Sequence, residues 1–193
     1  MLAQRLNNLN SVKNLKISLI LAVKNDSVLD SYLRFGRLGE RLESYSLVLI
    51  GNSLTENSIG FLETHLSRAN LKNLDLNFYS NKLGAAGAEI VSKSILSQKN
   101  LDQLSLDFYF NNITEVGTEA LCENILKINH ENLKTFYFNL DFNYIKNEGA
   151  QAVGNMLSQM TNLKSLHLGV ASKNFAYLGF KKLVNGLSKL TDL

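Results

Sequence analysis

The sequence predicts an α/β solenoid in which every repeat contributes one strand to a parallel sheet and one helix to a second layer. Three observations lead to this prediction: apolar residues recur every 29 to 32 positions, each period opens with alternating apolar residues, and each closes with apolar residues three or four apart. Alternation places side chains on one face of a strand, whereas the wider spacing places them on one face of a helix. Registered copies in this order predict stacked strand-turn-helix units.

The segment 71–100 shows the unit most clearly. Leu74, Leu76 and Phe78 alternate, which predicts a strand, and Val91 and Ile95 are four residues apart, which predicts a helix. Copies span residues 12–41, 42–70, 71–100, 101–132, 133–162 and 163–192, with a partial copy at 1–11 and the first leucine of another at Leu193. We therefore expect one domain over residues 1–193. The expected strands, parallel and in sequential order, lie near residues 15–19, 45–49, 74–78, 104–108, 136–140 and 166–170.

Two further columns recur between strand and helix. An asparagine amide at the exit from a strand can bond its own turn and the neighbouring one, so we expect it to be structural rather than an ordinary turn residue. This column contains Asn52, Asn81, Asn111 and Asn143. A small residue placed just before the helix suits either close backbone approach or a dihedral that only glycine adopts easily. This second column contains Ser58, Gly87, Gly117, Gly149 and Gly179.

The first copies and the two ends depart from this pattern. Gly36 occupies an inward position in the helix of the first copy, which predicts an irregular helix, and Tyr45 occupies a leucine position of the second copy. Neither end resembles the polar cap with which repeat arrays cover their last apolar face. We therefore expect a stacking partner at the uncapped ends, either further polypeptide or a second copy of the chain.

These columns carry a family resemblance. The pattern L-x-x-L-x-L-x-φ-x-x-N-x-I/L followed by G-A-x-x-φ, where φ is any apolar residue, resembles the ribonuclease-inhibitor-like class of leucine-rich repeats. The longer unit, rich in Asn and Lys, is similar to the leucine-rich repeat proteins of ciliates. The resemblance implies a leucine-rich repeat horseshoe with the parallel sheet on the concave face and helices on the convex face. For function it implies protein interaction.

Composition narrows the classes of function. The net charge is +3 and 19% of the residues are charged, so we expect neither nucleic acid nor a membrane as a partner. Cys122 is the only cysteine, which excludes an intramolecular disulfide, favours a reducing compartment and is best interpreted as a small buried hydrophobe. No run of about twenty apolar residues occurs. The expected location is cytoplasmic, or cytoskeletal or ciliary if the chain comes from a ciliate.

Catalytic patterns are hard to find. The three histidines, His65, His130 and His167, lack the spacing of a helical metal pair, and each is interpreted as a surface residue. No glycine-rich phosphate loop with a following lysine and no Gly-x-Ser-x-Gly elbow occurs. We therefore expect no enzyme, no cofactor and no metal; the least remote catalytic role is a regulator of GTPases.

A candidate interaction surface follows from the strand positions that point away from the helices. Tyrosine and isoleucine placed beside carboxylates on rigid strands are typical of an anchor with an acidic rim. The candidate protein-binding residues are Ile50, Asp75, Tyr79, Asp107, Tyr109, Tyr137 and Asp141. Two alternatives stay open: Tyr79 and Tyr109 turn inward as core, or a partner docks on the basic segment with Arg34, Arg37 and Arg41.

The function expected from this reasoning is a non-catalytic protein-protein interaction module or structural scaffold within a larger assembly. The alternative is a regulatory subunit that inhibits or modulates an enzyme, such as a nuclease or GTPase, by occluding its surface. An acidic concave face would favour the regulator, whereas an apolar concave face would favour the scaffold.

Overall fold

The structure, a computed structural model, describes residues 12–20, 38–172 and 175–193. Three expectations lie outside the described residues: the partial copy at 1–11, the helix with Gly36, and the placement of Arg34 and Arg37. The strands are β1 (Asn14–Ile20), β2 (Ser44–Ile50), β3 (Asn73–Asn77), β4 (Gln103–Asp107), β5 (Thr135–Asn139) and β6 (Ser165–Gly169). The helices are α3 (Glu56–Ile59), α4 (Phe61–Leu66), α5 (Gly84–Ser94), η1 (Ile95–Ser97), α6 (Glu115–Lys127), η2 (His130–Asn132), α7 (Lys146–Leu157) and α8 (Tyr177–Leu187).

The strands form one six-stranded sheet in the order β1-β2-β3-β4-β5-β6, with every neighbouring pair parallel. Equivalent repeat positions pair with one another, as in Asp75 with Ser105 and Tyr137 with His167. The predicted parallel, sequential sheet is therefore confirmed. From β3 onward, each strand begins and ends one residue before its predicted range.

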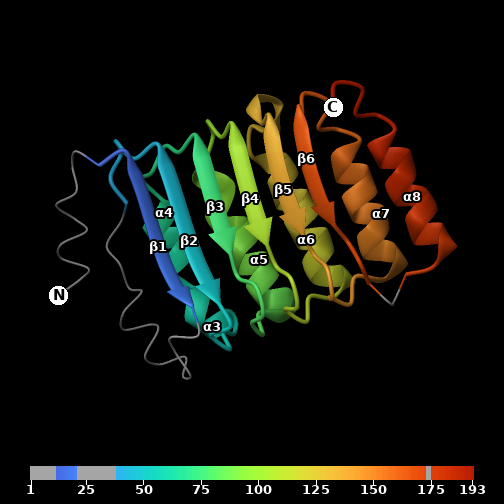
Figure 1. Ribbon diagram of the computed structural model, residues 1–193, viewed down its shortest axis with the longest axis horizontal. Coiled ribbons are helices and arrows are strands. Elements are labelled where there is room, and N and C mark those ends of the chain that lie inside the picture. Colours follow the sequence, from blue (N-terminus) through green and yellow to red (C-terminus); the bar gives the residue numbers. More distant parts are fainter. Residues whose placement is uncertain (1–11, 21–37, 173–174) are drawn as a thin grey trace.

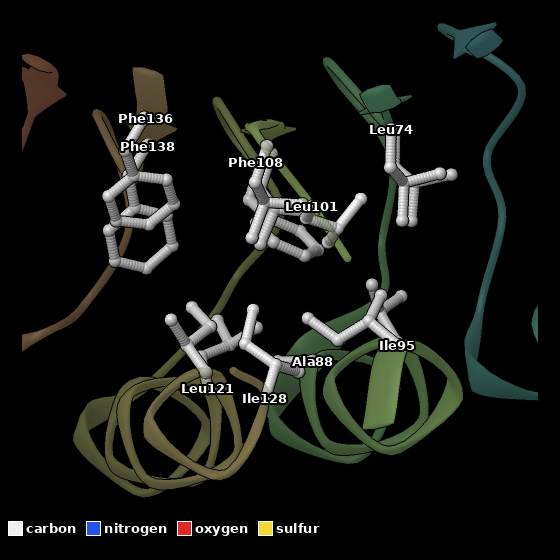
Figure 2. Packing of buried hydrophobic residues seen from close by; sticks show 14 of the residues in the cluster. Leu74, Ala88, Ile95, Leu101, Phe108, Leu121, Ile128, Phe136 and Phe138 are labelled. Atoms are coloured by element: carbon white, nitrogen blue, oxygen red, sulfur yellow. The ribbon is translucent and has the colours of Figure 1, made fainter. Parts of the chain in front are cut away.

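The helices cover one face of the sheet, and no described helix lies over the other (Figure 1). We call this second face the open face. The core lies between the two layers: Figure 2 shows Leu74 and Phe108 of the strand side directed toward Ile95 and Leu121 of the helical side. The alternating positions of β3 and β4 are fully or almost fully buried, because their side chains meet the apolar faces of α5 and α6.

The asparagine column ties each turn to the next. Asn81 Oδ1 accepts hydrogen bonds from the backbone N–H groups of Asn52 (2.9 Å) and Leu54 (3.0 Å). Its Nδ2 donates to the carbonyl oxygens of Leu49 (2.7 Å) and Phe78 (2.8 Å). These four backbone groups lie where the chain leaves the ladder, so the side chain satisfies what the sheet leaves unpaired. The structural role predicted for the column is confirmed.

The small-residue column permits close packing of successive helices. A Cβ atom added to Gly117 would lie 2.8 Å from Ala85 Cα of α5, and one added to Gly149 would lie 3.2 Å from Thr118 Cβ of α6. Among the described residues, the glycines with positive φ are Gly51 and Gly84, neither of which belongs to this column. Close approach is therefore the reason for the small residues, and the alternative based on special dihedrals is wrong.

One histidine differs from its interpretation as a surface residue. His65 is fully buried, and its Nε2 lies 2.9 Å from the hydroxyl of Tyr45. Tyr45 takes the place of a leucine, so its hydroxyl enters the core, where a polar group needs a partner. Burial raises the pKa of Tyr45, consistent with a neutral hydroxyl. The hydroxyl that Tyr45 brings into the core therefore has the ring nitrogen of His65 as its partner.

The described helices are short, and the longest of them, α6, has 13 residues. Within the part of the chain that the structure describes, no helix has both the length and the apolar character needed to cross a bilayer.

Candidate functional site

The candidate residues gather where the strands end on the open face. Asn77, Asp107 and Asn139 are the last residues of β3, β4 and β5 and stand beside one another in the register. Each uses a side-chain oxygen to accept a hydrogen bond from the backbone N–H two residues later: Tyr79 (3.0 Å), Tyr109 (2.9 Å) and Asp141 (3.0 Å). This repeated turn directs the side chains that follow the strands.

Tyr79 and Tyr109 stack on each other outside the core. Their ring centroids are 4.4 Å apart with an interplanar angle of 4°, and Phe142 lies against Tyr109 with a centroid distance of 4.9 Å. Tyr79 is 38% exposed and Tyr109 is half-buried, whereas the preceding Phe78 and Phe108 are fully buried. The alternative in which both tyrosines are core is therefore wrong. We call Tyr79, Tyr109 and Phe142 the aromatic ridge.

Two phenylalanines that the sequence reasoning missed occupy equivalent repeat positions just after the strand ends. Phe110 and Phe142 are 55% and 54% exposed, and both have positive φ, 53° and 59°. A left-handed conformation costs a residue with a side chain about 1–2 kcal/mol, and exposure forgoes the benefit of burial. The equivalent position of the second repeat is Gly51, also with positive φ. A glycine aligned with two phenylalanines was the signal that could have revealed them.

Asp75 has a different role from the rim position predicted for it. Its two carboxylate oxygens accept hydrogen bonds from Ser46 Oγ (2.7 Å) on β2 and Ser105 Oγ (2.8 Å) on β4. The carboxylate therefore links three strands across the open face, and both oxygens already have partners before any ligand arrives.

Asp107 is the most buried carboxylate of the open face, with 7% of its surface exposed. Burial raises its pKa above the usual range, and nearby Asp75 and Asp141 raise it further, while hydrogen bonds from Tyr109 and Tyr137 oppose the change. The Tyr137 hydroxyl donates to Asp107 Oδ2 over 3.5 Å, and its ring stacks on His167 with centroids 4.3 Å apart. The ridge thus borders a group of carboxylates.

Ile50 and Asp141 complete the predicted set. Ile50 is half-buried at the end of β2, next to the turn where Gly51 N–H donates to Tyr79 O (2.9 Å). Asp141 Oδ1 accepts a hydrogen bond from Ala171 N–H (2.5 Å), so this carboxylate bridges to the turn after β6. The structure therefore brings the tyrosines and Asp107 together and places Ile50 and Asp141 on either side of them.

The most nucleophilic residue type of the chain lies elsewhere. Cys122 is buried in α6, as predicted, and burial raises the pKa of its thiol, so little thiolate forms. Across residues 12–20, 38–172 and 175–193, no group of three or more His, Cys, Asp or Glu side chains could hold a metal ion. The described chemistry around the aromatic ridge is stacking, hydrogen bonding and negative charge, and Lys16 of β1 adds a positive charge at the far edge of the open face.

The chain was compared with known proteins: no family model matches it, and no curated protein does.

Proposed function

We propose that the chain is a leucine-rich repeat horseshoe, with the open face as its concave surface, and that it acts as a non-catalytic protein-binding module or scaffold. The repeat columns and the parallel sheet covered by helices on one face support the architecture. One observation carries the function: Tyr79 and Tyr109 stack on each other just after the ends of their strands. The asparagine column and the strand-end turns hold these segments in place.

Aromatic side chains of this kind suit protein recognition. Tyr79 and Tyr109 offer large surface with polar tips, and stacking has already restricted their rings, so binding costs little additional side-chain entropy. Phe110 and Phe142 hold exposed apolar rings in a conformation that other residues adopt at lower cost. Left-handed backbone conformations of this kind concentrate at functional sites. A docked partner would cover the exposed rings.

The alternative of a regulatory subunit that occludes an enzyme has its own support. Asp75 and Asp141 lie near Asp107, and the outward positions of β3 to β6 include no Lys or Arg, although β1 presents Lys16. A nuclease whose substrate is a polyanion presents a basic surface, to which this group is complementary. In this second candidate, the carboxylates attract the basic surface by their charge, because Asp75 is already hydrogen-bonded and Asp107 is largely buried. The aromatic ridge supplies the contact area.

Affinity capture with the purified chain tests the protein-binding proposal. The Tyr79→Ala/Tyr109→Ala variant should weaken binding of the captured partner by more than about 2 kcal/mol, because anchors of this size dominate interface energy. The circular dichroism spectrum should stay unchanged, and Val116→Ala, at an exposed apolar residue of α6, should retain full binding. If the double variant binds normally and reversal of Arg34, Arg37 and Arg41 to Glu abolishes binding, the basic segment is the docking site and the proposal is wrong.

A further inference from the structure

The side of α8 that is turned away from α7, which we call its outer face, differs from the corresponding side of the three helices before it. At the position after the glycine of the small-residue column, α5, α6 and α7 carry fully buried residues: Ala88, Thr118 and Ala150. The equivalent residue of α8 is Phe180, which is 56% exposed. Four residues later the earlier helices bury Ser92, Cys122 and Gly154, whereas α8 has Val184, which is 43% exposed.

Small residues on both helices of a neighbouring pair allow the two helices to approach closely. A Cβ added to Gly179 of α8 would lie 3.1 Å from Ala150 Cβ of α7, and one added to Gly186 would lie within 2.6 Å of three backbone atoms of Gly154. In α6, Asn124 Nδ2 donates to Ser92 Oγ of α5 over 2.9 Å. Small residues thus leave room for the next helix at this spacing.

Phe180 and Val184 fill that room. A phenyl ring has the volume of several methyl groups, and close-packed contacts tolerate little additional volume. A further helix of the same kind would therefore have to pack farther from α8 than α8 packs from α7, or turn these two side chains aside. Whatever covers this side must accommodate large side chains instead of small ones, which makes it a surface of another type.

The exposed side chains of α8 form a stripe with a defined spacing. Tyr177, Phe180 and Val184 are exposed and follow one another at intervals of three and four residues, and Leu187, three residues farther on, packs partly against the core. This is the spacing of positions a and d in a heptad, the pattern by which one helix recognises another. Lys181 borders the stripe, and α8, with the sequence YLGFKKLVNGL, contains no acidic residue.

We propose that the outer face of α8 docks an amphipathic helix of another protein, one whose apolar stripe is flanked by Asp or Glu. The apolar stripe supplies the contact area, and the cationic border selects the charge. A second copy of this chain fits less well, because a two-fold pairing of α8 would bring Lys181 toward the same lysine of its partner. This surface is separate from the aromatic ridge, so the proposal does not depend on the proposed function.

The test uses two synthetic fluorescent peptides of about three heptads, with leucine at positions a and d. One carries Glu at positions e and g, and the other carries Lys. Fluorescence anisotropy should show the intact chain binding the Glu peptide at least about tenfold more tightly than the Lys peptide. The variant Phe180→Ser/Val184→Ser should weaken binding of the Glu peptide about tenfold, and Lys181→Glu should reduce the preference between the peptides.

The control is Leu178→Ser, which removes an equally exposed apolar residue of α8 that lies about 200° around the helix from Phe180. It should leave peptide binding unchanged, and all variants should melt at the temperature of the original chain, because the altered side chains are exposed. Equal affinity for the two peptides, or full binding by the double variant, would overturn the proposal. So would a dimer in light scattering that the double variant dissociates, since a second copy would then occupy the face.

Discussion

Replacing Asn143 by alanine tests how the turns at the strand ends are held together. Asn143 is buried, and its Oδ1 accepts hydrogen bonds from the backbone N–H groups of Asn111 (3.0 Å) and Ile113 (2.9 Å). Its Nδ2 donates to the carbonyl oxygens of Phe108 (2.8 Å) and Leu140 (3.0 Å). The substitution therefore removes the partner of four backbone groups in two turns.

Each buried polar group that loses its partner costs about 1–3 kcal/mol. For four such groups, the added cost is about 4 kcal/mol or more. A water molecule that enters the vacated space would satisfy some of these groups and reduce the cost. We therefore expect Asn143→Ala to lower the free energy of unfolding by at least about 3 kcal/mol. For a domain of ordinary stability, about 5–15 kcal/mol, this is a large fraction of the total.

Urea unfolding followed by circular dichroism measures this loss. The matched control is Asn155→Ala, at an exposed position of α7, which should change the free energy of unfolding by no more than about 0.5 kcal/mol. A loss below about 1.5 kcal/mol for Asn143→Ala, with an unchanged denaturant slope, would refute the reasoning that the asparagine column satisfies the turns.

Two further predictions concern buried polar groups. Tyr45→Phe removes the hydroxyl that lies 2.9 Å from His65 Nε2 and should cost about 1–2 kcal/mol in urea unfolding; combining it with His65→Leu should cost less than the sum of the two single changes, and strict additivity would contradict the pairing. Asp107 has a raised pKa in the folded state, so its contribution to the free energy of unfolding falls as pH rises from the unfolded pKa through the folded one. Asp107→Asn should remove that decrease, and identical pH profiles for the variant and the original chain would contradict it.

The sequence was informative about the scaffold because one physical pattern is repeated. Alternation at Leu74, Leu76 and Phe78 identifies a buried strand face, and the same columns in each copy predict parallel pairing in register. The asparagine column was also predictable, because a polar residue that recurs where the ladder ends has backbone groups within reach of its amide.

The candidate site was predicted only in part. The pattern of one strand does not show which side chains of the neighbouring strands its residues bond. Asp75 was expected at a rim, yet serines from two neighbouring strands bond both of its oxygens. His65 was expected at the surface, because its partner Tyr45 is 20 residues away. Phe110 and Phe142 were missed because a left-handed backbone conformation is unusual for phenylalanine and is not expected from its residue type.

Hydrogen-deuterium exchange of the chain, with and without the partner obtained by affinity capture, tests the central claim most directly. We predict that binding slows exchange in the strand-end segments 78–81, 108–112 and 140–144, because the aromatic ridge becomes covered there. Slowed exchange confined to the outer surfaces of α5, α6 and α7, with unchanged exchange in those three segments, would contradict the assignment of the open face as the binding surface.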